Sequence, residues 1–203
     1  MARWSAIERS LRAEGARLIA GVDEVGRGPL AGPILACAII MPPAARAISG
    51  VADSKQLSAA ERERLAVKIR EKALCVSLGA ASVREIAEHN IYQATALAMR
   101  RALGRLSVRP DVVLVDGKPI RTLGVPHRAF VGGDSRIYVI ACASIVAKVA
   151  RDRLMRSLAA RHPSYGWEAN AGYGTPVHIA ALRARGVTAH HRELFCRGIL
   201  AGE

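Results

Sequence analysis

A glycine-rich stretch near the amino end, residues 21–33, constrains the fold of this chain more than any other segment. Its sequence is Gly-Val-Asp-Glu-Val-Gly-Arg-Gly-Pro-Leu-Ala-Gly-Pro, and it lies between apolar runs at residues 18–20 and 34–41. Each run predicts a buried strand, and the glycines and prolines predict a break between them. We therefore expect a tight turn that presents Asp23 and Glu24 at the end of a strand.

The residues of this turn suit a binding or catalytic site. Because side chains alternate between the two faces of a strand, only one of Asp23 and Glu24 is expected to face solvent. The glycines at positions 26, 28 and 32 permit positive φ and expose peptide N–H groups to an anion or a hydroxyl. An ordinary hairpin turn with surface acids is the alternative interpretation.

Composition indicates a folded, basic protein. The 203 residues are 51% hydrophobic, which is enough for one domain with a substantial core, and no apolar run has the length of a membrane span. Residues 1–15 lack the apolar segment of a secretory signal, so we expect a cytoplasmic protein with no membrane partner. The net charge of +13 favours nucleic acid as the partner, although a solvated basic surface would give the same count.

Strand and helix patterns alternate along the rest of the chain, which is typical of an α/β fold. Helices are predicted at about residues 58–73, 82–103, 138–161 and 176–185, the first two beginning with Ser-x-x-Glu capping boxes. Strands are predicted at 75–81, 111–117 and 129–131. The four cysteines are widely spaced in apolar contexts, which favours a place in the core over disulfides or zinc.

Two more acids follow predicted strands. Asp116 ends an apolar strand, and Asp134 follows a pair of glycines. If they meet Asp23 and Glu24, each pair of carboxylates repels by about 1–4 kcal/mol at a separation of about 4 Å, so a cation must compensate. Oxygen-rich sites select Mg²⁺ or Mn²⁺, and two such ions can hydrolyse a phosphodiester. The spacing leaves a simple turn role for Asp116 open.

Two loops carry residues suited to nucleic acid. Asp53, Ser54 and Lys55 come just before a predicted helix, where backbone donors and a lysine can hold phosphate. Tyr173 lies between two glycines with little local packing, so its ring can stack on a base or a sugar.

Other polar positions favour structural roles. Asn90 falls among the apolar positions of its helix. A polar group there needs a partner, so we expect either a core asparagine with its hydrogen bonds satisfied or a contact to a ligand. Residues 190–192, His-His-Arg, are expected in a polar tail. One side of the helix at 138–161 is expected to reach the surface, with Asp152 in a solvated ion pair, and this side carries Lys148, Arg151, Asp152 and Arg156.

Five motifs follow one another between residues 18 and 195. They are residues 21–33, Asp-Ser-Lys-Gln-Leu-Ser at 53–58, Val-Asp-Gly at 115–117, Gly-Asp-Ser at 133–135 with residues 143–153, and Gly-Tyr-Gly-Thr at 172–175. Together they resemble ribonuclease HII, the type 2 ribonuclease H family. The resemblance implies an α/β fold with a ribonuclease H-like mixed sheet flanked by helices and a helical C-terminal extension. It also implies a metal-dependent endonuclease that cuts the RNA strand of RNA–DNA hybrids and single ribonucleotides in duplex DNA, leaving 5′-phosphomonoesters.

The resemblance implies a role for each motif. The metal-binding catalytic carboxylates, with Mn²⁺ or Mg²⁺ and two ions during catalysis, would be Asp23, Glu24, Asp116 and Asp134. The ribose 2′-hydroxyl would be recognised by the backbone of Gly26, Arg27 and Gly28. Ser54 and Lys55 would lie near phosphate, and Tyr173 would pack on the sugar beside the scissile junction.

We expect a single catalytic domain over residues 1–203, with residues from about 162 to 203 as a substrate-contacting extension. We also expect a monomer, although nothing in the sequence reports the oligomeric state. Residues 136–138, Arg-Ile-Tyr, and Leu194 depart from the family pattern. These departures leave the four acids intact but put substrate contacts at those positions in doubt.

Two alternative functions remain on the sequence alone. A nucleic-acid-binding module without activity would account for the charge, and a glycosidase would use two carboxylates without metal. A chelator separates the three, because it stops only a metal-dependent nuclease.

Overall fold

The computed structural model describes residues 4–51 and 54–202 and is centred on a five-stranded sheet. The strand order is β3-β2-β1-β4-β5. β1 (Ile19–Val25), β2 (Ile34–Ile40) and β3 (Cys75–Ala81) are antiparallel neighbours, whereas β4 (Val112–Asp116) and β5 (Arg128–Phe130) continue the sheet in parallel with β1. The predicted mixed sheet is confirmed.

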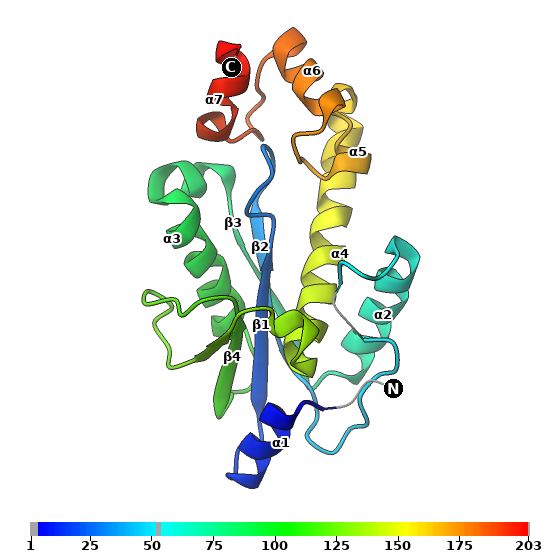
Figure 1. Ribbon diagram of the computed structural model, residues 1–203, viewed down its shortest axis with the longest axis vertical. Helices are drawn as coiled ribbons and strands as arrows, with labels where there is room; N and C mark the ends of the chain where they lie inside the picture. The colour runs from blue at the N-terminus through cyan, green and yellow to red at the C-terminus, as the bar shows by residue number, and fades with distance from the viewer. Residues whose placement is uncertain (1–3, 52–53, 203) are drawn as a thin grey trace.

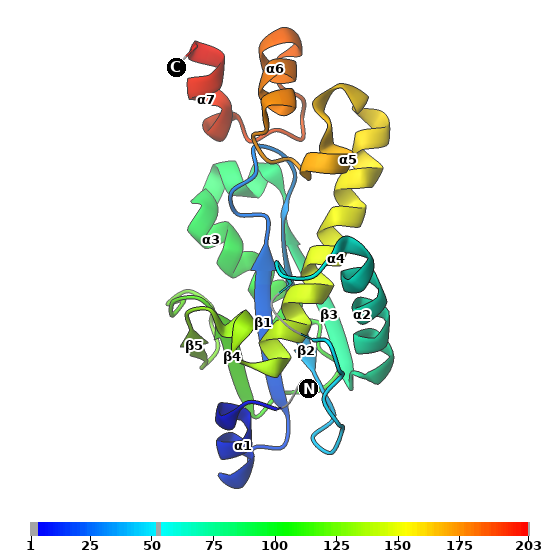
Figure 2. The same cartoon turned by 45° about the vertical axis from the view of Figure 1, so that its right-hand side comes forward.

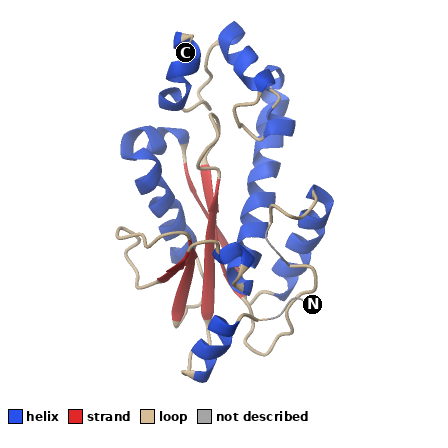
Figure 3. Ribbon diagram, in the orientation of Figure 1, coloured by secondary structure: helices blue, strands red, loops and turns tan. Residues whose placement is uncertain are grey.

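Helices cover both faces of the sheet (Figures 1 and 3). α3 (Val83–Gly104) packs on one face, and α2 (Ala59–Lys72) and α4 (Tyr138–Arg161) cover the other. Strand β2 is buried throughout because its side chains alternate between two cores: Cys37 and Ile39 face α4, and Ala36 and Ala38 face α3. All four cysteines are buried and free, as predicted.

Two glycines let the helices approach the sheet closely. A Cβ at Gly21 of β1 would lie 2.3 Å from the backbone carbon of Val139 in α4. A Cβ at Gly79 of β3 would lie 2.1 Å from the carbonyl oxygen of Ala98 in α3. Each glycine is therefore required by helix packing rather than by a turn.

The helix starts follow their capping signals. Ser58 with Glu61 and Ser82 with Glu85 form the predicted capping boxes. α4 has no side-chain cap of its own, and the cap comes from α1 (Ala6–Ala13), where the buried Glu8 accepts the N–H groups of Tyr138 at 3.2 Å and Val139 at 3.0 Å. This contact fixes the amino-terminal helix to the start of α4.

The C-terminal elements gather beyond the carboxyl end of β1, at the top of Figures 1 and 2. They are the 3₁₀ turn η2 (Pro163–Tyr165), α5 (Trp167–Asn170), α6 (Pro176–Arg185) and α7 (Glu193–Ala201). A separate apolar cluster joins them to the end of α4 through Met155, Leu158 and Trp167. The predicted helical C-terminal region is confirmed. Among the described residues, no helix is long and apolar enough to cross a membrane.

Two elements differ from the prediction. β1 runs through Asp23 and Glu24 to Val25, so the acids lie within the strand, because Gly21 is a packing glycine and not part of a turn. α3 is kinked at Asn90, whose φ is 66° and whose side chain accepts the N–H groups of Tyr92 and Gln93. Asn90 is exposed and caps the second half of the helix, so its predicted place in the core is wrong.

Candidate active site

The four predicted catalytic acids line one cavity of about 380 Å³. Asp23 and Glu24 come from β1, Asp116 is the last residue of β4, and Asp134 lies in the 3₁₀ turn η1 (Gly133–Ser135). Parallel pairing of β1 with β4 sets Val22 opposite Val115, which brings the following acids side by side. The cavity is also lined by residues 25–28, Ser54, Lys55, Ser144, Lys148 and Tyr173.

The acids disfavour one another's ionisation. Asp23 is only 5% exposed, and burial, followed by the charges of Glu24 and Asp116, raises its pKa well above the usual range. Burial also raises the pKa of Asp116, although its Oδ1 accepts the Gly133 N–H at 2.6 Å. Glu24 has a pKa raised by burial and partly offset by Arg27, 3.4 Å away.

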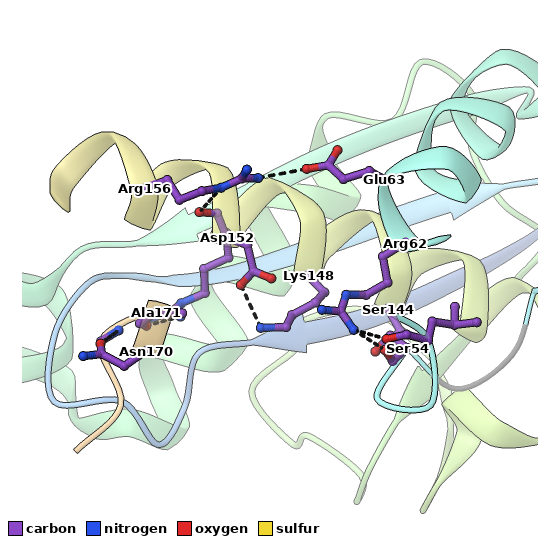
Figure 4. Close-up of polar contacts among 12 residues, drawn as sticks. Ser54, Arg62, Glu63, Ser144, Lys148, Asp152, Arg156, Asn170 and Ala171 are labelled. Atoms are coloured by element: carbon purple, nitrogen blue, oxygen red, sulfur yellow. Dashed lines mark hydrogen bonds and ion pairs between the residues drawn. The ribbon is translucent and has the colours of Figure 1, made fainter. Parts of the chain in front are cut away.

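The lysine of the predicted phosphate loop reaches the acids. Lys55 Nζ lies 2.8 Å from Asp134 Oδ2. Ser54 is held from two sides: its hydroxyl lies 2.9 Å from that of Ser144, and Arg62 donates to its carbonyl oxygen at 3.0 Å, as Figure 4 shows. Asp53 falls outside the described residues.

The donor set fits a hard divalent cation by chemistry and charge. Carboxylate oxygens are the preferred ligands of Mg²⁺ and Mn²⁺, and a bound cation would offset the burial and the repulsion between acids that raise the pKa values of Asp23 and Asp116. Within residues 4–51 and 54–202, no three His, Cys, Asp or Glu side chains already converge as a metal-binding group. Asp134 is turned to Lys55 and Asp116 to the amide of Gly133.

The glycine loop forms the wall of the cavity next to Tyr173. Gly26 has a φ of 90°, and a Cβ there would lie 2.1 Å from Arg151 Nε. Gly32 also has positive φ, but Gly28 does not; a Cβ at Gly28 would instead lie 3.7 Å from the Tyr173 ring. Tyr173 is 44% exposed, and Leu30 N–H binds the neighbouring Gly172 carbonyl at 2.8 Å. The tyrosine turn and the glycine loop therefore form one unit.

The sequence model of ribonuclease HII matches residues 20–198. This chain belongs to the ribonuclease HII family. It is 52% identical over 182 residues to the ribonuclease HII of Roseobacter denitrificans, covering 89% of this chain and 91% of the relative. With that of Thermosynechococcus vestitus it shares 49% identity over 197 residues, covering 97% and 92%. The crystal structure of the ribonuclease H2 from Pyrococcus horikoshii aligns with a TM-score of 0.76 at 26% identity, covering 91% of this chain and 98% of that one.

Membership in the ribonuclease HII family makes the protein a metal-dependent endoribonuclease of the ribonuclease H class, whose members act on RNA–DNA hybrids. The cavity with the four acids is where such chemistry has suitable groups. A larger cavity of about 580 Å³, between the end of α3 and the start of β4, is mainly apolar and has Asp111 as its single acid.

Arg151 contradicts the prediction of a surface position in this ribonuclease HII chain. It is fully buried and donates to the carbonyl oxygens of Pro33 at 3.1 Å, Ala171 at 2.8 Å and Ala31 at 3.0 Å. The apolar periodicity of α4 gave the signal that was missed, because residues 144, 147, 151, 155 and 158 are all buried on one stripe.

His191 and Arg192 also contradict their predicted place in a polar tail. Each is 2% exposed, and Arg192 donates to carbonyl oxygens of the glycine loop. His191 lies against His178, with 3.0 Å between their Nε2 atoms. The polar sequence context of Arg192 gave no signal of burial, because its side-chain partners are backbone carbonyls more than 150 positions away.

The remaining predicted positions divide between surface and core. Asp152 forms the expected ion pair, with Lys148 at 2.7 Å, while Arg156 pairs with Glu63 at 2.9 Å (Figure 4). Of the departures from the family pattern, Ile137 and Tyr138 are buried in the core, and Tyr138 accepts the Ile48 N–H at 2.9 Å. Arg136 and Leu194 are exposed.

Proposed function

We propose that this protein hydrolyses the RNA strand of RNA–DNA hybrids and also cuts at single ribonucleotides within duplex DNA. The observation that carries the proposal is one cavity that joins four carboxylates to a glycine loop and an exposed tyrosine. The acids supply the means of hydrolysis, and the loop and the ring supply the means of recognising ribose.

For hydrolysis, we propose that Asp23, Glu24, Asp116 and Asp134 hold divalent ions, Mg²⁺ or Mn²⁺, with two ions during catalysis. Bound ions of this kind activate water and stabilise the leaving oxygen of a phosphodiester. The raised pKa values of Asp23, Glu24 and Asp116 support this assignment, because burial and the neighbouring carboxylates disfavour their charged forms and a bound cation would favour them. Lys55 at Asp134 balances part of the charge.

For recognition, we propose that the peptide groups of Gly26, Arg27 and Gly28 bind the ribose 2′-hydroxyl while Tyr173 packs on the adjoining sugar. The nearness of Gly28 to the Tyr173 ring supports a shared subsite, since both can face the same nucleotide. Ser54 and Lys55, at the cavity edge, would contact phosphate.

The wider proposals concern the whole chain. A net charge of +13 supports binding to the phosphate backbone of a duplex. We propose one catalytic domain over residues 1–203, with residues from about 162 to 203 contacting substrate, because Tyr173 lines the cavity from that region. A monomer in the cytoplasm remains our expectation.

A substrate panel tests the proposal. Four labelled duplexes of one sequence would be compared: a long hybrid, DNA with one ribonucleotide, all-DNA and all-RNA, each with Mg²⁺, Mn²⁺ or excess chelator. We expect cleavage of the first two with a divalent ion and none in chelator. Binding without any cleavage would favour the inactive binding module, and glycoside hydrolysis that persists in chelator would favour the glycosidase.

A further inference from the structure

Two buried arginines lie behind the glycine loop. Arg151 is fully buried and Arg192 is 2% exposed, yet neither takes part in an ion pair among the described residues. Both guanidinium groups instead bind carbonyl oxygens of residues 26–33 and of Ala171. A buried charge needs such compensation, so the loop and the arginines constrain each other.

Arg192 spans the loop with its whole guanidinium fork. Nη1 donates to the Arg27 carbonyl at 2.8 Å, Nη2 to that of Gly26 at 2.5 Å, and Nε to that of Gly32 at 3.0 Å. The planar guanidinium group therefore binds carbonyls from both the start and the end of the loop. Lysine, with a single nitrogen, has no equivalent geometry.

The carbonyl contacts determine where the peptide N–H groups point. In a trans peptide the C=O and the N–H of the next residue point in opposite directions. The carbonyls of Gly26 and Arg27 point to Arg192, so the N–H groups of Arg27 and Gly28 point away from it. Residues 26–28 line the cavity whereas Arg192 lies behind them, and no hydrogen bond within the described chain uses these two N–H groups.

Arg192 is itself held by backbone pairing and by a buried histidine pair. Its N–H binds the Leu30 carbonyl at 2.8 Å, and the Gly32 N–H binds that of His190 at 2.8 Å. His191 contacts His178, which also contacts the carbonyl of Tyr173 at 2.9 Å. The C-terminal segment therefore fixes the glycine loop and the tyrosine turn together.

We propose that Arg192 is a positioning residue for ribose recognition, which holds the peptide planes of residues 26–28 so that two adjacent N–H groups face the nucleotide at the cut. The proposal rests on the proposed function of the cavity. Arg192 itself touches neither substrate nor ion. It determines how strongly one 2′-hydroxyl is distinguished from a hydrogen.

The test compares two constants for each variant. One is the KM for a duplex with one ribonucleotide, and the other is the inhibition constant of the all-DNA duplex of the same sequence as a competitor. Their ratio measures how strongly the 2′-hydroxyl is read. The variants are Arg192→Gln, Arg192→Lys and a control, Arg197→Gln, which removes the same charge from an exposed position in α7.

We expect Arg192→Gln to lower the ratio about tenfold, the effect of losing one to two hydrogen bonds to the hydroxyl. Arg192→Lys keeps the charge but not the geometry, so its ratio should lie between those of Arg192→Gln and the wild type. Arg197→Gln should weaken both duplexes alike and leave the ratio unchanged. Melting temperatures accompany each measurement.

A wild-type ratio in either folded Arg192 variant would overturn the proposal. Failure of both variants to fold would also overturn it, since Arg192 would then be shown to act as structural support. If the wild-type enzyme itself shows no preference for the ribonucleotide, the proposed function fails instead, and the two failures are distinguishable.

Discussion

At the scale of single residues, a substitution of Asp116 tests whether this carboxylate serves catalysis rather than folding. Asp116→Asn keeps the side-chain volume and an oxygen that can accept the Gly133 N–H, but removes a charge from a crowded site. We expect cleavage to fall to background. Because burial raises the pKa of Asp116 in the folded state, removing its charge should not lower the free energy of unfolding measured in chelator.

The same substitution at the other end of β4 is the control for this prediction. Asp111 is exposed, and its carboxylate accepts the N–H groups of Arg17 and Leu18 at 2.8 Å, which lowers its pKa. Asp111→Asn should slightly destabilise the fold and leave cleavage intact. Wild-type turnover by Asp116→Asn, measured beside it, would rule out the assigned site.

Substitutions of Tyr173 test the proposed recognition of the sugar beside the cut. If its ring packs on the sugar, Tyr173→Ala should reduce cleavage of a lone ribonucleotide by roughly 5- to 150-fold, the range expected for loss of one stacking contact. A long hybrid offers many registers and should lose less. Tyr173→Phe should keep most activity because the ring remains.

An exposed tyrosine on α3 provides a matched control. Tyr92 is 40% exposed, and its hydroxyl accepts the Arg121 N–H at 3.2 Å. Tyr92→Ala should leave the preference between the two substrates unchanged. Equal losses on both substrates in Tyr173→Ala, together with a lower melting temperature, would show that the ring only fills the turn.

At the scale of elements, Gly21 determines how closely α4 approaches β1. Gly21→Ala would place a Cβ within 2.4 Å of the Val139 carbonyl oxygen and push the helix outward. We expect a loss of about 3 kcal/mol in the free energy of unfolding. Gly104→Ala, at the end of α3 with no atom within 4 Å, should be neutral or stabilising. Equal urea denaturation midpoints for the two variants would contradict this account of the packing.

The contact between α6 and the segment after it predicts a pH dependence. Burial, followed by the charges of His178, His162 and His190, lowers the pKa of His191 to about 4, below the value of about 6.5 in an unfolded chain. The neutral form is favoured by folding, so this stability is complete above about pH 6.5 and is lost as the pH falls toward 4. At pH 5 the loss should be about 2 kcal/mol.

Urea denaturation between pH 7.5 and pH 5 measures this effect. His191→Gln has no proton to bind in that range, so its stability should fall less steeply with acid than that of the wild type. Parallel pH profiles for the two proteins would contradict the assignment of His191 as a buried neutral histidine.

Local patterns predicted most of the elements. Ser58 and Ser82 mark helix starts, and the apolar runs mark strands, because capping and hydrophobic periodicity act over a few residues. The predicted end of β1 was wrong because a glycine such as Gly21 can belong to a turn or to a close packing contact, and the sequence alone does not distinguish the two. The predicted core position of Asn90 was wrong because the helix is kinked at this residue, so its side chain does not follow the periodicity of the helix.

At the scale of the whole molecule, the resemblance to ribonuclease HII placed the four acids together, whereas their spacing in the sequence left open whether they meet. Parallel pairing of β1 with β4 brings Asp23 and Asp116 side by side, and all four acids line one cavity. Arg192 was missed because buried arginines are uncommon and its partners are carbonyl groups that no side-chain pattern reveals. Arg151 was missed although it lies on the buried stripe of α4, because its charge favoured a surface position.

The chemistry of the cut ends tests the central claim most directly. A duplex with one ribonucleotide, labelled at both ends of the cut strand, is incubated with Mg²⁺ or Mn²⁺, and the new termini are identified. Hydrolysis by water at the four-carboxylate site predicts a 3′-hydroxyl and a 5′-phosphate, formed with the divalent ion and absent in chelator. A 2′,3′-cyclic phosphate, or cleavage that persists in chelator, would contradict the account, because the 2′-hydroxyl would then be the nucleophile and not the group that is recognised.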